Sequence, residues 1–368
     1  MACRKEKVNS GPEQLMERHT DEGETMATLM DVARAAGVSK ATASRALQRP
    51  ELVAEPTRLR VREAAERLGF QPNAAARALT TGRTGLVGLI VPTLSNPFFA
   101  PLVMGAQQAA EETHSHLLIA VSEYDPQREA ALADRLSEQA DGLIMVTPVG
   151  TDSALRERFR RCPLVLVDRQ VGRLPAVVAD TAAGLAELLG HLLSQGHRDI
   201  AYVSGPAGSW ADEQRRTALT AQAVETGARI HVLGPLPPTF DAGIEASRSL
   251  PRGATAVLAY NSYLALGLLH GLTVAGCRVP EDVSLAAADD LSTLGATTPP
   301  VTALDVPLQE AGALAVTRLH ELLAGQRRTV TSRLPAHPVL RASTARPAAP
   351  ASGDLLSRPV DSYVTGTS

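Results

Sequence analysis

An N-terminal all-α domain followed by an α/β core of two doubly wound subdomains is the fold class that the sequence predicts. Within residues 28–68, apolar side chains recur at helical spacing, which is typical of packed amphipathic helices. From Leu86 onward, short and nearly continuous apolar runs alternate with amphipathic segments. This alternation indicates parallel sheets that are covered by helices on both faces. The 368 residues exceed the usual size of one hydrophobic core, so more than one domain is expected.

Two short helices joined at a glycine turn are predicted over residues 28–47, TLMDVARAAGVSKATASRAL. Thr28 and Asp31 form a capping-box start, and Ser39 is a second N-cap just after Gly37. Each helix has one apolar face, so the two helices are expected to pack together as a helix-turn-helix. The apolar positions are Leu29, Val32, Ala33, Ala36, Ala43, Ala46 and Leu47.

The outward face of the second helix carries short donors and cations of a size that reaches base edges and phosphates in a major groove. These outward residues are Lys40, Ala41, Thr42, Ser44 and Arg45. The helix is therefore a candidate recognition helix for duplex DNA. An ordinary solvated helical hairpin is the alternative interpretation.

The charge of the chain is unevenly distributed. Residues 27–83 contain ten Lys and Arg against five Asp and Glu, a net charge of +5, so the rest of a chain whose total is −3 must carry −8. A small basic module on an acidic body suits one surface that meets a polyanion and another that does not. A segment with this charge can also be an ordinary solvated surface, so charge alone does not decide the function.

A third helix is predicted over residues 57–68, and a short fourth one follows. The apolar stripe of the third helix consists of Leu59, Val61, Ala64, Ala65 and Leu68. Residues 69–73 then break the pattern, and Asn73 is placed to cap a short helix that ends at Gly82. Because this last helix has few apolar groups, it is expected to form only against a partner.

Ten strands are predicted in the remainder of the chain. Ten strands over about 260 residues fit two doubly wound subdomains better than one. Such sheets place ligands at the carboxyl ends of their strands, and a pair of them leaves a cleft between the two. The predicted strands are residues 86–92, 115–123, 141–148, 163–169, 176–181, 200–206, 228–233, 254–261, 283–290 and 301–307.

Composition narrows the class of protein further. Cys3, Cys162 and Cys277 have no close spacing, which argues against a zinc cluster and a disulfide framework, and it favours a reducing cytoplasm. No apolar run reaches the length of a bilayer span, and the first 25 residues lack the apolar centre of a signal peptide. We therefore expect a cytoplasmic protein with no membrane partner. The tails, residues 1–26 and 346–368, have the composition of disordered segments.

Enzymatic function is a rival hypothesis, because doubly wound sheets support many reactions. The sequence contains no GxGxxG, GxxxxGK[ST], GxSxG or HExxH motif. Nucleotide, phosphate and hydrolase chemistry therefore lack their usual residues, and we expect neither catalytic residues nor a cofactor. His191 and His197 lie near a predicted helix end without metal-spaced partners, so a structural role is expected for both rather than a metal site.

A series of motifs follows the helix-turn-helix in a fixed order. They are FQPNAAARALTTGRT, VGLIVPTLSNPFF, DGLIMV, PLVLVDR, HLLSQGHRDIAYVSGP, ALGLL, GCRVPEDVSL with the following DDL, and LRAST. Each motif alone is weak, but by their order and spacing the chain resembles the lactose/galactose repressor (LacI/GalR) family of bacterial transcription regulators over residues 28–344.

The resemblance implies a division of the chain and a mode of action. Residues 27–70 would read DNA, residues 71–83 would form a hinge helix and linker, and residues 84–345 would form a core like periplasmic sugar-binding proteins. This core would bind an effector, a sugar or a derivative, and would form the homodimer. The partner would be a pseudo-palindromic DNA operator, with a central CG step implied by the family. A periplasmic-type binding protein is the less favoured alternative.

The resemblance also assigns DNA contacts. Thr42, Ser44 and Arg45 would contact DNA, while Lys40 and Ala41 would vary the operator preference. The phosphate anchors would be Ser39 and Thr57. In the hinge, Asn73, Ala76 and Arg77 match the minor-groove helix, and Leu79 matches a leucine that is wedged into a base step. The alternative for Leu79 is a core residue that packs on its own domain.

A set of effector contacts follows from the same resemblance. Arg215 aligns with an arginine that holds the effector, and Arg216 is the fallback if the register slips by one. Asp168 and Asp289 end strands on the cleft side, although the acidic pairs there can equally be helix caps or solvated loop residues. The remaining predicted contacts are Ser95, Asn96, Phe98, Trp210, Asn261 and Ser262.

Four departures from the family pattern stand out. Ala54 replaces a capping serine, and Ala43 replaces a valine of the recognition helix. Ser262 stands where an aspartate usually grips sugar hydroxyls, and Ala287–Ala288 stand where glycine and a large residue are common. Aromatic residues are only 3% of the chain, so surfaces that stack on sugars are scarce. The hypothesis is that the cleft binds something other than a typical hexose, or that effector sensing is altered or lost.

Overall fold

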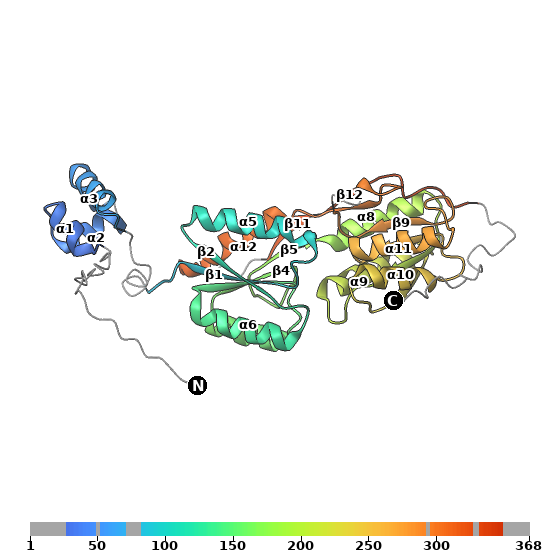
Figure 1. Ribbon diagram of the computed structural model, residues 1–368. Helices are drawn as coiled ribbons and strands as arrows, with labels where there is room; N and C mark the ends of the chain where they lie inside the picture. The colour runs from blue at the N-terminus through green and yellow to red at the C-terminus, as the bar shows by residue number, and fades with distance from the viewer. Residues whose placement is uncertain (1–26, 49–51, 71–81, 292–294, 327–330, 349–368) are drawn as a thin grey trace, which may run out of the picture. The chain divides into compact units, whose positions relative to one another are not determined.

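The computed structural model describes residues 27–48, 52–70, 82–291, 295–326 and 331–348 (Figure 1). The chain separates into two compact units, residues 1–82 and 83–368. The predicted hinge residues Asn73, Ala76, Arg77 and Leu79 lie outside the described residues, as do residues 1–26 and 349–368. Among the described helices, none is long and apolar enough to span a bilayer.

The first unit contains α1 (Leu29–Ala35), α2 (Lys40–Gln48) and α3 (Glu55–Arg67). The predicted capping box is confirmed, because the Thr28 hydroxyl accepts the Asp31 N–H and the Asp31 carboxylate accepts the Thr28 N–H at 3.0 Å. Ser39 caps α2 as predicted, since its hydroxyl accepts the Thr42 N–H at 3.1 Å. The small core consists of Val32, Ala33, Ala36, Ala43, Ala46, Val61, Ala64 and Ala65.

The third helix differs from its prediction in its start and in its apolar face. It begins at Glu55 rather than Thr57, and Ala54 provides no side-chain cap. Leu59 and Leu68 were expected in the core, but they are 44% and 38% exposed. The three smaller residues of the predicted stripe are buried. Only these smaller residues contribute to the core, so the buried face of the helix is narrower than the apolar stripe in the sequence.

The second unit contains two six-stranded sheets, which form the first and second subdomains (Figure 1). The first sheet has the order β11 (Thr331–Pro335), β5 (Ala176–Asp180), β4 (Leu164–Val167), β3 (Gly142–Val146), β1 (Leu86–Val91) and β2 (His116–Val121). The second has the order β12 (His337–Val339), β10 (Thr302–Asp305), β9 (Ser284–Ala287), β8 (Ala256–Ala259), β6 (Asp199–Val203) and β7 (Arg229–Leu233). All ten predicted strands are therefore confirmed.

The sequence did not reveal the last two strands. β11 adds a parallel strand beside β5, whereas β12 runs antiparallel to β10, so the second sheet is mixed at this edge. Both strands are short, and TSRLP and HPV contain no apolar run. With them, the described chain crosses between the subdomains three times, after β5, after β10 and after β11.

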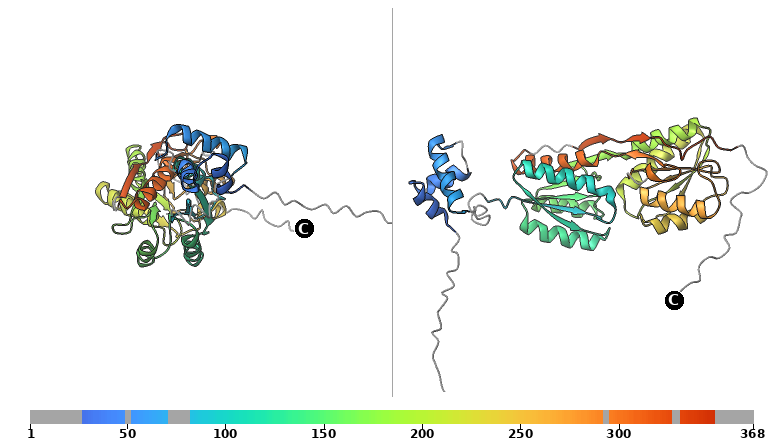
Figure 2. Two further views of the ribbon diagram at one scale, coloured as in Figure 1. Left: turned by 90° about the vertical axis from the view of Figure 1, so that its left-hand side faces the viewer. Right: turned by 45° about the horizontal axis from the view of Figure 1, so that its top comes forward.

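Helices cover both faces of each sheet (Figure 2). In the first subdomain, α5 and α12 lie on one face, and α6 and α7 on the other. In the second, α10 and α11 lie on one face, and α8 and α9 on the other. The bounds of these helices are α5 (Ala100–Glu112), α6 (Pro126–Gln139), α7 (Asp152–Arg161), α8 (Thr181–Ser194), α9 (Trp210–Thr226), α10 (Phe240–Arg248), α11 (Ser262–Val274) and α12 (Leu308–Leu323).

Candidate DNA-binding surface and effector cleft

The outward face of α2 has the character that the sequence predicts. Lys40, Ala41 and Arg45 are exposed, and Thr42 and Ser44 are half-buried. The opposite face of α2 packs in the hydrophobic core of the first unit. Neither Lys40 nor Arg45 forms an ion pair with any residue that the structure describes, so both cations are available to an anionic partner.

The two predicted phosphate anchors lie at helix starts. Ser39 is exposed at the N-terminus of α2. Thr57 lies in the first turn of α3, where its backbone N–H already donates to the Ala54 carbonyl at 3.0 Å. Only its half-buried side chain therefore remains for an outside contact.

A buried arginine and two carboxylates form a small polar cavity between the subdomains, here called the inner chamber. Arg215 on α9 donates through Nε to the Thr181 hydroxyl at 3.0 Å and through Nη1 to the Tyr260 carbonyl at 2.8 Å. Its guanidinium also lies 4.8 Å from the centre of the Tyr260 ring. These contacts hold the guanidinium in place, while Nη2 has no hydrogen-bond partner among the described residues.

The two carboxylates of the inner chamber follow strand ends, as predicted. Asp168 accepts the Ala179 N–H at 2.8 Å, and Asp289 accepts the Ser262 N–H at 2.5 Å. Burial raises the pKa of each carboxyl to about 6, although these hydrogen bonds and the charge of Arg215 oppose the increase. Each carboxylate is thus fixed through one oxygen beside a shared buried cation.

The remaining predicted residues occupy different parts of the cleft. Asn96 and Asn261 line the inner chamber, but both side chains also act as caps, for Phe98 N–H and Leu264 N–H. Phe98 packs against a hydrophobic core of each subdomain. Trp210 belongs to the second subdomain and packs against a hydrophobic core of the first. Both aromatic side chains therefore help to hold the subdomains together.

A wider compartment, here called the outer groove, continues from the inner chamber through Asn96 and Tyr124. Ser95 lies in it, and the Ser95 carbonyl accepts a hydrogen bond from the Tyr263 hydroxyl across the cleft at 2.8 Å. The groove is lined by Thr93, Ser95, Asn96, Glu123, Tyr124, Pro206, Pro237, Pro238, Thr239, Phe240 and Tyr263.

Several acidic and basic neighbours of the predicted residues are engaged elsewhere. Arg216 pairs with Asp212 at 3.1 Å, so the fallback for Arg215 is not needed. Asp290 pairs with Arg341, and Arg169 pairs with Asp152 at 2.9 Å. Asp290 and Arg169 are therefore engaged in ion pairs within the protein, rather than in a helix cap or a solvated loop.

Sequence reasoning missed Tyr124 and Thr147. Tyr124, Thr147 and Asp168 follow the ends of β2, β3 and β4, and all three have left-handed backbone angles, with φ values of 59°, 46° and 53°. Residues other than glycine adopt this conformation rarely, and such residues cluster at functional sites. Here all three line the cleft. Their position just after a strand was the available signal, but the sign of φ is not visible in the sequence.

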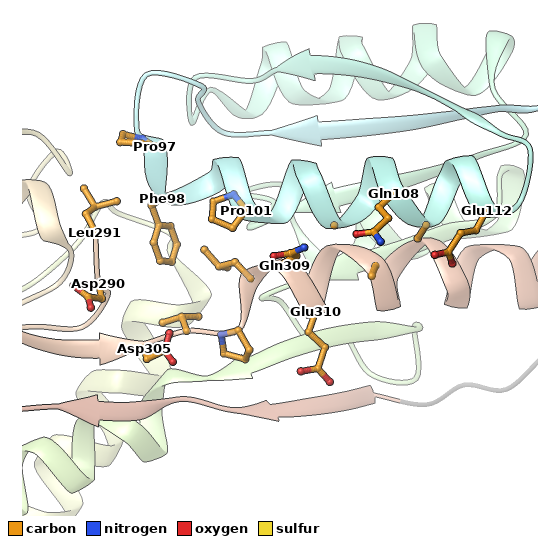
Figure 3. A pocket seen from close by; sticks show the side chains of 16 residues that line it. Pro97, Phe98, Pro101, Gln108, Glu112, Asp290, Leu291, Asp305, Gln309 and Glu310 are labelled. Atoms are coloured by element: carbon orange, nitrogen blue, oxygen red, sulfur yellow. The ribbon is translucent and has the colours of Figure 1, made fainter. Parts of the chain in front are cut away.

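Another hollow lies outside the cleft (Figure 3). It is an open groove of about 810 Å³ between α5 and the start of α12, into which Phe98, Pro101 and Leu291 project. Carboxylates such as Asp305 and Glu310 lie at its edge without a buried cation. The cleft, which has buried polar groups with raised pKa values, is the stronger candidate for a ligand site.

Comparison with known proteins identifies the family. Residues 28–73 match the model of bacterial regulatory proteins, lacI family, and residues 189–344 match a periplasmic binding protein-like domain. The HTH-type transcriptional regulator DegA of Bacillus subtilis (strain 168) is 32% identical over 297 residues, which make up 78% of this chain and 88% of DegA. The chain belongs to the LacI family. It is a DNA-binding transcriptional regulator with an effector-binding, periplasmic-binding-protein-like core.

Solved structures of LacI-family proteins share the fold. The Lac repressor dimer bound to operator and the anti-inducer ONPF has a TM-score of 0.77 with 24% identity, over 87% of this chain and 99% of that one. The complex of the transcriptional regulator CelR with cellobiose has a TM-score of 0.64 with 27% identity, over 86% of this chain and 99% of that one. The relatives are regulators rather than enzymes.

Three of the four departures from the LacI-family pattern concern positions that are buried in the structure. Ser262 is fully buried and lines neither compartment of the cleft, so its contribution there is the backbone N–H that holds Asp289. Ala287 and Ala288 are also fully buried, which leaves no large side chain at this strand end. In the DNA-binding unit, Ala43 is completely enclosed by the small core.

We expect Asp289→Asn to stabilise the regulator at neutral pH. The pKa of the Asp289 carboxyl is about 6 in the folded protein and about 3.8 in the unfolded chain. The neutral carboxyl therefore contributes stability that is complete below pH 3.8 and is lost as the pH rises through about 6. Ionisation of Asp289 in the folded protein therefore costs about 3 kcal/mol at pH 8, because one pKa unit corresponds to about 1.4 kcal/mol, and an asparagine oxygen still accepts the Ser262 N–H. Urea unfolding at pH 8 and pH 5 measures the effect, and an advantage as large at pH 5 as at pH 8 would contradict it.

Proposed function

We propose that this LacI-family regulator is a dimeric repressor that acts in the cytoplasm. It binds a pseudo-palindromic operator with a central CG step, and a small-molecule effector in the cleft controls this binding. The observation that carries the proposal is the joining of two features in one chain. One is the exposed polar face of α2, and the other is the inner chamber with Arg215, Asp168 and Asp289.

The proposed DNA contacts are those that the resemblance to the LacI/GalR family implies. Thr42, Ser44 and Arg45 read base edges, and Lys40 and Ala41 tune operator preference. Ser39 and Thr57 anchor to phosphates. In the hinge, Asn73, Ala76 and Arg77 occupy the minor groove, and Leu79 is inserted into the central step, where unstacking kinks the DNA.

The effector acts through the three chain crossings between the subdomains. A ligand that binds both walls of the cleft favours one angle between the sheets, because it contacts the two subdomains differently in each state. The angle sets the spacing of the paired hinge helices in the dimer, so DNA binding and effector binding are coupled. A regulator with altered or lost sensing is the second candidate, favoured by the burial of Ser262. A sugar-binding protein of the periplasmic type is less favoured, because it does not explain the basic helical unit.

The experiment that tests the proposal is selection of binding sites from a random DNA library, followed by salt titration. We expect enrichment of two related half-sites around a central CG step. Because Lys and Arg contacts release counterions from DNA, the affinity for the selected site should fall steeply with salt. No enriched motif, or an affinity that does not change with salt, would overturn the proposal.

Dimer formation is proposed to use the first subdomain. β2 is the edge strand of its sheet, and apolar side chains are exposed beside this edge, Ile119 by 43% and Met104 on α5 by 64%. An exposed apolar strand edge favours pairing with another chain.

We expect Met104→Glu to convert the dimer to monomers and to weaken operator binding, because a charge is buried at the contact. Sedimentation velocity measures the oligomeric state. Val224→Glu is the matched control, because it places the same charge on α9 at a side chain that is 79% exposed. If Met104→Glu remains as dimeric as the control, the interface lies elsewhere.

A further inference from the structure

The two compartments of the cleft differ greatly in size. The inner chamber has a volume of about 40 Å³, whereas the outer groove has about 520 Å³. The smaller volume holds about three water molecules, so it admits one or two hydroxyl groups but not a whole sugar ring. The larger volume lies in the usual range of small-molecule sites. Most atoms of a ligand bound to this conformation therefore lie in the outer groove.

The outer groove is suited to an uncharged, apolar group. Its wall in the second subdomain consists of prolines and rings, among them Pro237, Pro238, Phe240 and Tyr263. Among the residues that the structure describes, no lysine, arginine or histidine lines the groove, and the only carboxylate there, that of Glu123, is paired with Arg128 at 3.1 Å. A phosphate or carboxylate placed there would lose its hydration without gaining a cationic partner.

The inner chamber is suited to hydroxyl groups. Arg215 already has two carboxylates beside it, so an anionic group would meet more negative than positive charge. A cationic group would lie next to a buried guanidinium. Two hydroxyl groups can donate to Asp168 and to Asp289, and either can accept from the free Nη2 of Arg215, which satisfies these three groups without added charge.

From this arrangement, we infer that the effector is an uncharged molecule of two parts, in which a hydroxylated end enters the inner chamber and an apolar ring lies in the outer groove against Pro238, Phe240 and Tyr263. Asn96 and Tyr124 lie at the junction, because they line both compartments. The inference rests on the proposed function, in which the cleft holds the effector. Glycosides with an aromatic aglycone and nucleosides share this chemistry.

Calorimetric titration of the full-length regulator with matched compounds tests the inference. Each common hexose and pentose is compared with its phenyl glycoside and its sugar phosphate, and ribose is also compared with the common nucleosides. We expect at least one compound with an apolar ring to bind about tenfold tighter than its free sugar. The glycoside and nucleoside series distinguish the two sources of this chemistry, and no sugar phosphate should bind more tightly than its parent.

Variants of the groove make the test specific. Phe240 is 39% exposed, so Phe240→Ala should fold normally, and it should weaken binding of the compound with the apolar ring more than binding of its free sugar, which removes most of the advantage of the ring. Val224→Ala, far more exposed on α9, is the control and should keep the advantage. The inference is overturned if free sugars bind as tightly, if phosphates bind best, if nothing binds, or if Phe240→Ala keeps the advantage. Binding of the same protein preparations to the selected operator distinguishes failure of this inference from failure of the proposed function. Operator binding persists if only the effector chemistry is wrong.

Discussion

Arg45→Ala is expected to lower operator affinity by about tenfold to a hundredfold, the range for one lost base contact. Arg45 is exposed on α2 and has no ion pair within the described residues, so its removal does not disturb the unit. The neighbouring positions Ala43 and Ala46 hold the helix in the core. The loss should therefore appear in DNA binding and not in the helical content of the protein.

Fluorescence anisotropy with the selected operator measures this loss. Arg135→Ala is the matched control, because it removes one exposed arginine from α6 in the first subdomain, outside the DNA-binding unit. The control should bind like the original protein. If Arg45→Ala retains full affinity and its discrimination against scrambled DNA, α2 is not the recognition helix.

Gly105→Ala should destabilise the core by about 3 kcal/mol or more, because it overpacks a contact between two helix backbones. A Cβ atom at Gly105 on α5 would lie 1.9 Å from the Gln309 carbonyl oxygen of α12. The contact is reciprocal, since a Cβ at Gly312 would lie 2.0 Å from the Leu102 carbonyl oxygen. The two helices must separate to accept even one methyl group, which opens the apolar face that they cover.

Gly190→Ala provides a control with the opposite expected sign. Its Cβ on α8 would meet Gln222 Nε2 at 3.5 Å, an ordinary contact. Alanine is favoured over glycine in a helix by about 1 kcal/mol, so this variant should be as stable as the original protein or more stable. Urea unfolding of both variants is the measurement. Equal stability of the two variants would show that α5 and α12 are not in backbone contact.

Much of the fold was predictable because the decisive signals are local. Thr28 with Asp31 and Ser39 are caps that act within four residues, and the ten apolar runs are long enough to be recognised individually. β11 was missed because its residues TSRLP become a strand only by pairing with β5, a distant part of the chain. The exposure of Leu59 likewise depends on how little core its unit contains.

The candidate cleft was predictable in its charged centre but not in its shape. Asp168, Arg215 and Asp289 were expected from strand ends and family resemblance, and the structure brings them together. The left-handed backbone at Tyr124 was not visible, because sterically rare conformations follow from tertiary packing rather than from residue type. The burial of Ser262 was hidden for the same reason, since a residue type does not reveal how tightly its neighbours enclose it.

Footprinting on the DNA that flanks the coding region of this regulator tests the central claim most directly. Regulators of this kind often control neighbouring genes, and the paired recognition helices of a dimer would protect two half-sites about one helical turn apart or a multiple of it. The predicted result is one such protected segment that is lost with Arg45→Ala and retained with Arg135→Ala. Uniform protection of all DNA, or protection that is unchanged by Arg45→Ala, would contradict the account.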